Sequence, residues 1–156
     1  MEPPAIVCHP IAWVRGGRTE ATKDGWGPNR CRIELDTTRF GPEALMGLEA
    51  VSHIEVVFHF HLHQDEALET GARHPRGRTD WPRVGIYAQR GRMRANRLGV
   101  SVCQLLAVDG TALEVLGLDA VDGTPVLDIK PVWSGYLPRG ERREPAWAAE
   151  LMSGYW

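Results

Sequence analysis

LGVSVCQLLAVDGTALEVLGLDAVDGTPVLDIKP, residues 98–131, contains the strand and turn pattern that decides the fold. Residues 98–108 and 112–116 are rich in aliphatic and β-branched side chains, and Asp109-Gly110 between them is a typical hairpin turn. A second turn at Asp122-Gly123 precedes another short predicted strand, 126–130. Short strands joined by tight turns indicate an antiparallel all-β structure.

The rest of the chain follows the same pattern. We predict further strands over 6–15, 31–35, 53–62 and 84–89, a short helix over 43–48, and polar loops over 16–29 and 64–82. Strands and helices do not alternate as in a doubly wound sheet, so the pattern favours a small antiparallel β-barrel with minor helices. Trp147, Leu151 and Tyr155 are spaced as on one face of a helix. We therefore expect a single domain over 1–156, with the barrel over about 5–132 and a helical tail over about 133–156.

Composition places the chain among ordinary globular proteins. It has 156 residues, of which 43% are hydrophobic and 24% charged, and its net charge is −2. We find neither an apolar run long enough to cross a membrane nor a signal sequence, so we expect no membrane association and a cytoplasmic location. Cys8, Cys31 and Cys103 show no CxxC spacing, and we expect them to be reduced and mostly buried. GxGxxG, P-loop and GxSxG motifs are absent, which argues against the common nucleotide-binding and hydrolase folds.

Arginine is concentrated in one part of the chain. Of the 18 basic residues 16 are arginine, and eight of these lie between Gly71 and Arg97, where Asp80 is the only acid. Such a basic stretch in a slightly acidic protein indicates an anionic partner, because guanidinium groups suit phosphates and carboxylates. A solvated arginine-rich loop without a partner is the competing interpretation.

Three histidines alternate with apolar residues in VVFHFHLHQD, residues 56–65. On a strand, His59, His61 and His63 would share one face. Imidazoles on one face can bind zinc when a further ligand completes the tetrahedron. They can equally line a pocket that binds no metal, and the spacing alone does not separate the two.

A turn and a charged strand face follow one another near residue 125. The glycine of Asp122-Gly123-Thr124-Pro125 permits a positive φ, and the backbone N–H groups of such a turn can face a ligand. Asp128 and Lys130 alternate with apolar residues, so they share a face of the next strand. The alternative is an ordinary β-turn beside a surface ion pair.

These segments together resemble the TsaA-like family, whose best-known members are the TrmO-type tRNA methyltransferases. The resemblance runs from about residue 6 to residue 131 and rests on ALMGLEAVSHIEVVFHFH, HPRG, GIYAQR and GLDAVDGTPVLDIKP, in that order. The family fold is a small antiparallel β-barrel that binds S-adenosylmethionine, and its members form dimers. Its best-known reaction methylates N6 of threonylcarbamoyladenosine in tRNA. The resemblance therefore implies a methyltransferase with that cofactor, a tRNA partner, a homodimer, and a short form without the C-terminal domain of the long bacterial enzymes.

The resemblance also implies a cofactor site built from matching positions. They lie in the loop before the second strand, after the histidine strand, in the arginine stretch, and in the turn near residue 125: Trp26, Gly27, His61, Leu62, Arg90, Val100, Asp122, Gly123, Thr124 and Pro125. The histidine that matches His61 borders the cofactor in the family. No metal is therefore expected, and His59 and His63 become neighbours of the site or substrate contacts.

One stretch departs from the family pattern. The usual TRSPxRPNPIG is here QRGRMRANRLG, residues 89–99, with Gln89 in place of Thr and arginines in place of two prolines. We expect this loop to project outward, with no acid to neutralise its arginines, and to hold an anionic substrate, tRNA first, through Arg92, Arg94, Asn96 and Arg97. Asp128 and His61 are the candidate general bases. A small metabolite or peptide as methyl acceptor, and a non-catalytic module that binds the cofactor or RNA, remain alternatives.

Overall fold

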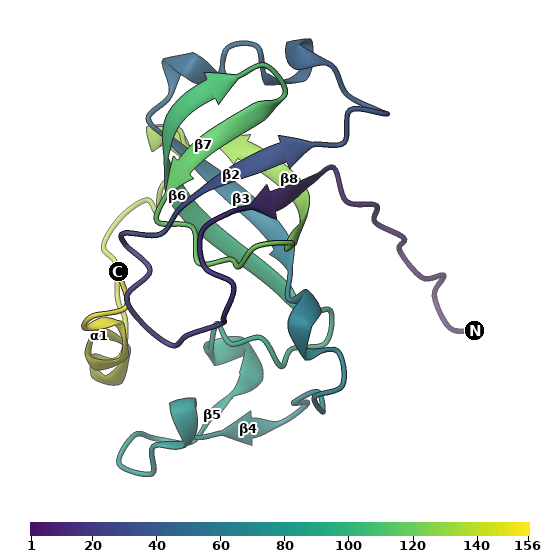
Figure 1. Ribbon diagram of the computed structural model, residues 1–156. Coiled ribbons are helices and arrows are strands. Elements are labelled where there is room, and N and C mark those ends of the chain that lie inside the picture. Colours follow the sequence, from purple (N-terminus) through teal and green to yellow (C-terminus); the bar gives the residue numbers. More distant parts are fainter.

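Six antiparallel strands close into a barrel in a computed structural model that describes residues 1–156 (Figure 1). Neighbouring strands follow the order β1-β2-β7-β6-β3-β8 around the barrel. Their bounds are β1 Ala12–Arg15, β2 Arg30–Leu35, β3 His53–His59, β6 Leu98–Asp109, β7 Ala112–Leu116 and β8 Pro125–Pro131. The predicted fold class is confirmed.

Alternating side chains build the core because successive residues of a strand point to opposite faces. Ile54, Val56 and Phe58 of β3 are buried, and they meet the buried residues of the other strands inside the barrel. Gly99 on β6 lies directly opposite Phe58, and a Cβ at Gly99 would stand 2.4 Å from the phenyl ring. The ring therefore occupies the space that any larger residue at 99 would need.

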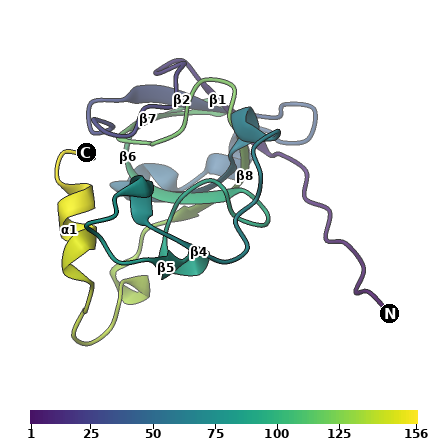
Figure 2. The same cartoon turned by 90° about the horizontal axis from the view of Figure 1, so that it is seen from below.

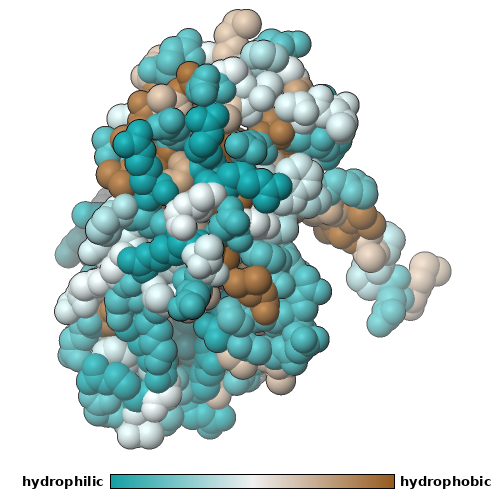
Figure 3. Space-filling model, in the orientation of Figure 1, coloured by the Kyte–Doolittle hydropathy of each residue, from teal (hydrophilic) through white to brown (hydrophobic).

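The chain between β3 and β6, residues 60–97, forms a separate lobe that lies below the barrel in Figure 1. We call it the arginine lobe, and the barrel end that faces it the lobe end. Two short strands, β4 Ala72–Arg73 and β5 Val84–Gly85, pair with each other there. The surface of this part is mostly hydrophilic in the view of Figure 3. Short 3₁₀ helices, including His61–His63, Pro75–Gly77 and Ile86–Ala88, supply its remaining regular structure.

Several predicted boundaries are wrong for local reasons. The first strand covers only Ala12–Arg15, because residues 1–10 extend away from the body without a partner strand (Figure 1). The predicted helix over 43–48 consists of two 3₁₀ turns, Pro42–Leu45 and Leu48–Ala50, on either side of Gly47, whose φ of +93° breaks the helix. The predicted strand over 84–89 becomes 3₁₀ helix after Gly85.

The tail contains the helix α1, Ala146–Met152. The predicted helix face included Tyr155, but the helix ends before that residue. Further 3₁₀ turns include Ser134–Tyr136. Cys31 and Cys103 are buried and unpaired as expected, but Cys8 is exposed because it lies on the extended N-terminal arm. No helix combines the length and the apolar character that crossing a membrane requires.

Candidate functional site at the lobe end of the barrel

The three histidines do not share a strand face, contrary to the prediction. β3 ends at His59, and Phe60, with ψ of 83°, turns the chain into the 3₁₀ helix that holds His61 and His63. The Phe60 amide donates to the carbonyl of Arg97, the residue just before β6, and the Phe60 ring packs edge-on against Phe58. This packing of the ring ends the strand. No group of three or more metal-ligating side chains comes together anywhere in the chain.

His61 lies against the turn that precedes β8. A Cβ built on Gly123 would stand 3.7 Å from Nε2 of His61, and Gly123 has φ of +82°. Burial, followed by the charges of His59 and His63, lowers the pKa of His61 below its usual value. The imidazole is therefore neutral at neutral pH and able to accept a proton.

The backbone amides of the turn are all bonded within the protein, two of them to β1 and the loop that follows it, and here the sequence interpretation needs correction. The amides of Asp122, Gly123 and Thr124 donate to the carbonyls of Arg18, Val14 and Val121, respectively. None of these N–H groups is left to face a ligand, and Pro125 has none. Thr124 is buried, so the side of the turn next to His61 is formed by the bare Cα of Gly123.

The loop between β1 and β2 lies beside this turn. Besides the bond from the Asp122 amide to the Arg18 carbonyl (2.7 Å), the Gly16 amide donates to Oδ1 of Asp122 (2.8 Å). The Arg18 guanidinium lies 4.8 Å from the ring centre of Trp26, which is itself buried. Trp26 and Gly27 are thereby fixed at the same barrel end as His61 and the turn.

Arg90 and Val100, two of the cofactor residues that the resemblance implies, are neighbours. Nη2 of Arg90 donates to the carbonyl of Val100 at 2.6 Å. Val100 points outward from β6 and is 37% exposed, while the next residue, Ser101, points inward and is buried. The Ser101 hydroxyl donates to Asp119, which also accepts a hydrogen bond from Tyr155. Sequence reasoning missed Asp119 and Ser101, although both lie within motifs that it used.

Asp128 is not brought to His61. It lies on β8 opposite Val57 of β3, which in turn lies opposite Val100 of β6. Its carboxylate forms an exposed ion pair with Lys130, with Oδ2 and Nζ 2.7 Å apart. The shared strand face is confirmed, and the structure favours the surface ion pair over a catalytic base at this position. Leu62 is exposed beside His61.

The arginines of the 89–97 loop are engaged with the protein, which contradicts the expectation that they project outward without an acidic neighbour. Arg92 donates through Nε and Nη2 to the carboxylate of Glu66, and this contact holds the pKa of Glu66 below its usual range. Arg94 and Arg97 donate only to backbone carbonyls. Only Arg92 of the three is therefore neutralised by an acid. The exposed Asn96 forms no side-chain hydrogen bond.

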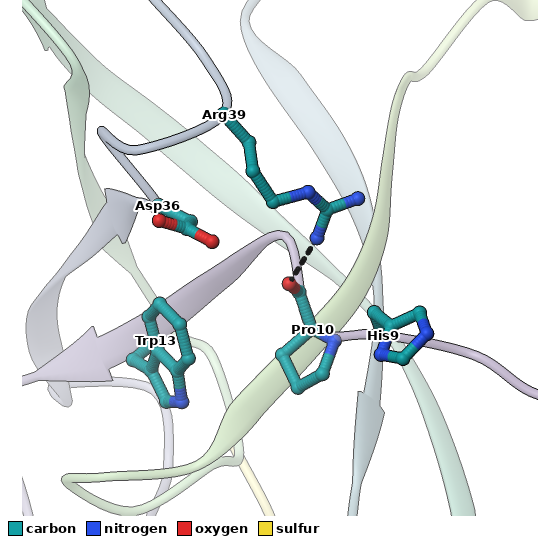
Figure 4. Close-up of a pocket in the computed structure, with 5 residues that line it drawn as sticks. All are labelled: His9, Pro10, Trp13, Asp36 and Arg39. Atoms are coloured by element: carbon teal, nitrogen blue, oxygen red, sulfur yellow. Dashed lines mark hydrogen bonds between the residues drawn. The ribbon is translucent and has the colours of Figure 1, made fainter.

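A hollow of about 480 Å³ lies elsewhere, between the N-terminal arm and the loop after β2 (Figure 4). His9, Pro10, Trp13, Asp36 and Arg39 line it, and Arg39 donates to the Pro10 carbonyl at 3.0 Å. It contains none of the predicted site residues. Trp13 pairs with Pro125 on β8, so the hollow adjoins the far side of the turn.

The chain is similar in sequence to several known proteins. The model of the tRNA-methyltransferase O N-terminal domain matches residues 23–136. The tRNA (adenine(37)-N6)-methyltransferase of Escherichia coli is 38% identical over 115 residues, which are 71% of this chain and 47% of that protein. A probable S-adenosyl-L-methionine-binding protein of Methanothermobacter thermautotrophicus is 40% identical over 91 residues, 58% of this chain and 62% of that one.

Solved structures show the same fold. The crystal structure of TrmO from Pseudomonas aeruginosa superposes with a TM-score of 0.74 at 30% identity, covering 93% of this chain and 62% of that chain. The chain spans 47% of the length of the Escherichia coli relative and 21% of the mouse one. With its closed barrel and the match over residues 23–136, the chain belongs to the tRNA-methyltransferase O N-terminal domain family.

Proposed function

We propose that the chain binds S-adenosylmethionine at the lobe end of the barrel and transfers its methyl group to N6 of threonylcarbamoyladenosine in tRNA. The observation that carries this proposal is the convergence of separate segments at one barrel end. His61, the Gly123 turn and the Trp26 loop lie there together, and Arg90 joins them through Val100 and the neighbouring Ser101. Relatives named as methyltransferases of this type support the reaction.

The residues present suit a cationic sulfonium cofactor. The missing Cβ at Gly123 leaves space in front of His61, and a side chain there would reach the imidazole. The lowered pKa of His61 keeps a second positive charge away from a sulfonium. The carboxylates of Asp119 and Asp122 add negative charge nearby.

The chain's own contribution to the reaction is chiefly alignment. The cofactor supplies a methyl group already activated on sulfur, and holding two reactants in line can account for about 7–11 kcal/mol of a barrier. An N6–H acceptor must also lose a proton. We propose that the neutral imidazole of His61 accepts this proton. Asp128 is the weaker candidate because its carboxylate pairs with Lys130.

The test is methyl transfer from radiolabelled S-adenosylmethionine to tRNA, followed by mass spectrometry of the nucleosides. We expect label in N6-methylated threonylcarbamoyladenosine, and none when the tRNA lacks the threonylcarbamoyl group. Cofactor binding without transfer to either tRNA would contradict the proposed acceptor. Because Glu66 neutralises Arg92, the loop has less positive charge for tRNA phosphates. This observation favours the second candidate, a small methyl acceptor on the same barrel.

We also propose that the protein is a homodimer that forms through the outer face of β6. Leu98, Val100, Val102 and Leu106 point outward there and are 37–46% exposed. Apolar rows of this kind on a sheet are typical of interfaces. We expect Val102→Lys to give a monomer by light scattering, whereas Met46→Lys, at an exposed apolar residue outside the barrel strands, leaves the dimer intact. A wild-type monomer at micromolar concentration with cofactor present would contradict this.

A further inference from the structure

The last residues of the chain pair with the loop that carries Trp26. The amides of Gly25 and Trp26 donate to the carbonyls of Gly154 and Tyr155 at 3.0 and 2.7 Å. Gly27 is so close that a Cβ there would stand 2.7 Å from the carbonyl carbon of Trp156. The segment follows α1, which lies beside the arginine lobe, and it ends at the barrel (Figure 2). It therefore lies across one side of the proposed cofactor site.

α1 fixes the direction of this segment. The indole N–H of Trp81, in the arginine lobe, donates to Oε2 of Glu150 at 2.8 Å. The rings of Trp81 and Trp147 lie 6.3 Å apart. These contacts anchor the helix to the lobe, so that residues 153–156 extend from a fixed point toward the Trp26 loop.

Near the end of this segment, the side chain of Tyr155 contacts Asp119. Its hydroxyl donates to Oδ2 of the carboxylate, while the Ser101 hydroxyl donates to Oδ1. These two hydroxyls are the side-chain partners of Asp119, and the carboxylate is partly buried. Burial and the neighbouring carboxylate also raise the pKa of Tyr155, so that the phenol stays protonated and keeps donating. Asp119 is thus a carboxylate that two neutral hydroxyls hold and that has no salt-bridge partner.

The position of this carboxylate matters because its two partners, Ser101 and Tyr155, are directly linked to proposed cofactor residues. Ser101 directly follows Val100, whose carbonyl binds Arg90, and Asp119 lies three residues before Asp122. Tyr155 accepts the Trp26 amide through its carbonyl. A ligand bound among these residues would reach Asp119 if the Tyr155 hydroxyl moved aside.

We propose that Asp119 is a further cofactor-binding residue and that Tyr155 holds its place in the ligand-free protein. A hydroxyl or ammonium donor of S-adenosylmethionine would take over Oδ2, and the phenol of Tyr155 would leave it. No covalent bond changes in this exchange. The inference rests on the proposed function, since it names a contact within the same cofactor site.

The exchange predicts opposite effects for the two partners. In Tyr155→Phe the Tyr155–Asp119 hydrogen bond is already absent. The ligand can then bond to Asp119 without breaking that hydrogen bond, so its affinity should rise. Asp119→Asn removes the charge that the ligand donor would meet. A hydrogen bond to a charged group corresponds to about a tenfold change in a dissociation constant.

The experiment is titration calorimetry of the full chain with S-adenosylmethionine and with methylthioadenosine, which keeps the ribose hydroxyls but lacks the ammonium group. Tyr155→Phe is expected to bind S-adenosylmethionine about fivefold to tenfold more tightly and Asp119→Asn about tenfold more weakly. Tyr136→Phe is the matched control, because that phenol is exposed and forms no hydrogen bond. If only S-adenosylmethionine is affected, the donor lies in the methionyl part, which carries the ammonium; if both ligands are affected equally, it lies in the adenosine part, which carries the ribose hydroxyls.

Unchanged or weaker binding by Tyr155→Phe, with circular dichroism showing a folded protein, would overturn the inference and leave the proposed function standing. The Tyr155→Phe result decides the exchange even if Asp119→Asn does not fold. If neither the wild type nor any variant binds S-adenosylmethionine, the proposed function fails and the inference fails with it.

Discussion

His61 faces Gly123 across a gap that a single methyl group would enter, because a Cβ at Gly123 would stand 3.7 Å from Nε2 of the imidazole. The two residues are far apart in the sequence, and they meet because β3 and β8 are neighbours in the barrel. The proposed cofactor site is built around this relationship.

Gly123→Ala should therefore affect ligand binding as well as stability. Its φ of +82° is strained for alanine, at a cost of about 1–2 kcal/mol in the free energy of unfolding. Gly47→Ala is the control, since its φ is +93° and nothing lies within 4 Å of the added Cβ. We expect both variants to lose similar stability in urea, but only Gly123→Ala to bind S-adenosylmethionine more weakly. Equal binding by the two variants would show that the gap is not part of the site.

Gly99→Ala tests the packing that supports Val100. The added Cβ would stand 2.4 Å from the Phe58 ring, so either the ring or the strand must move. Overpacking of this kind typically lowers the free energy of unfolding by about 1–3 kcal/mol. Gly85→Ala, whose Cβ would meet nothing closer than 3.9 Å, should unfold at nearly the wild-type urea concentration. The same midpoint for both variants would contradict the close packing at Gly99.

Only one of the three cysteines should react in the folded protein. Burial raises the pKa of Cys31 to about 11 and that of Cys103 to about 12, from an ordinary value of 9.0. Because the thiolate is the reactive form, a thiol reagent at pH 8 should label only the exposed Cys8, and all three thiols after denaturation. More than one fast thiol in the folded protein would be inconsistent with this burial.

The same shifts predict how stability depends on pH. Both thiols have folded-state pKa values above the unfolded value, so the unfolded state loses its protons first as the pH rises. Their contribution to stability is fully present below about pH 9 and is lost as the pH rises toward 11 and 12. Cys103→Ala should show a shallower loss of stability between pH 9 and 11 in urea unfolding than the wild type.

Arg92 and Arg94 should differ in RNA binding, although they are two residues apart. Glu66 already neutralises Arg92, whereas Arg94 has no carboxylate partner. If the lobe binds tRNA phosphates, Arg94→Ala should lower the slope of log affinity against log salt by about one unit, and Arg92→Ala should lower it less. RNA affinity at several salt concentrations measures both slopes. A larger loss for Arg92→Ala would contradict the charge assignment.

Much of the fold was predictable because alternating apolar residues and tight turns mark strands locally. The hairpin at Asp109-Gly110 and the strand after Pro125 lie where the pattern indicates. The histidine strand was predicted too long, because alternation continues past His59 while tertiary contacts of Phe60 end the strand. No local pattern reports such a contact.

The resemblance named candidate cofactor residues, and their role stays a prediction, whereas contacts between residues far apart in the sequence were not predicted. The link between Asp119 and Tyr155 joins two segments 36 residues apart, one of them outside the matched family region. Likewise, the sequence shows Arg92 in a stretch without acids, whereas the fold brings Glu66 to it from the start of the lobe. A count of the charges that are close in the sequence therefore overestimates the free positive charge of this loop.

The central claim is that S-adenosylmethionine binds at the lobe end of the barrel through residues that include Arg90. Titration calorimetry of chelator-treated wild type, Arg90→Ala and Arg92→Ala with this cofactor tests it most directly. We expect binding to the wild type without added metal, a loss of about tenfold or more for Arg90→Ala, and nearly unchanged affinity for Arg92→Ala. No binding by the metal-free wild type, or equal affinity for the wild type and Arg90→Ala, would contradict the account.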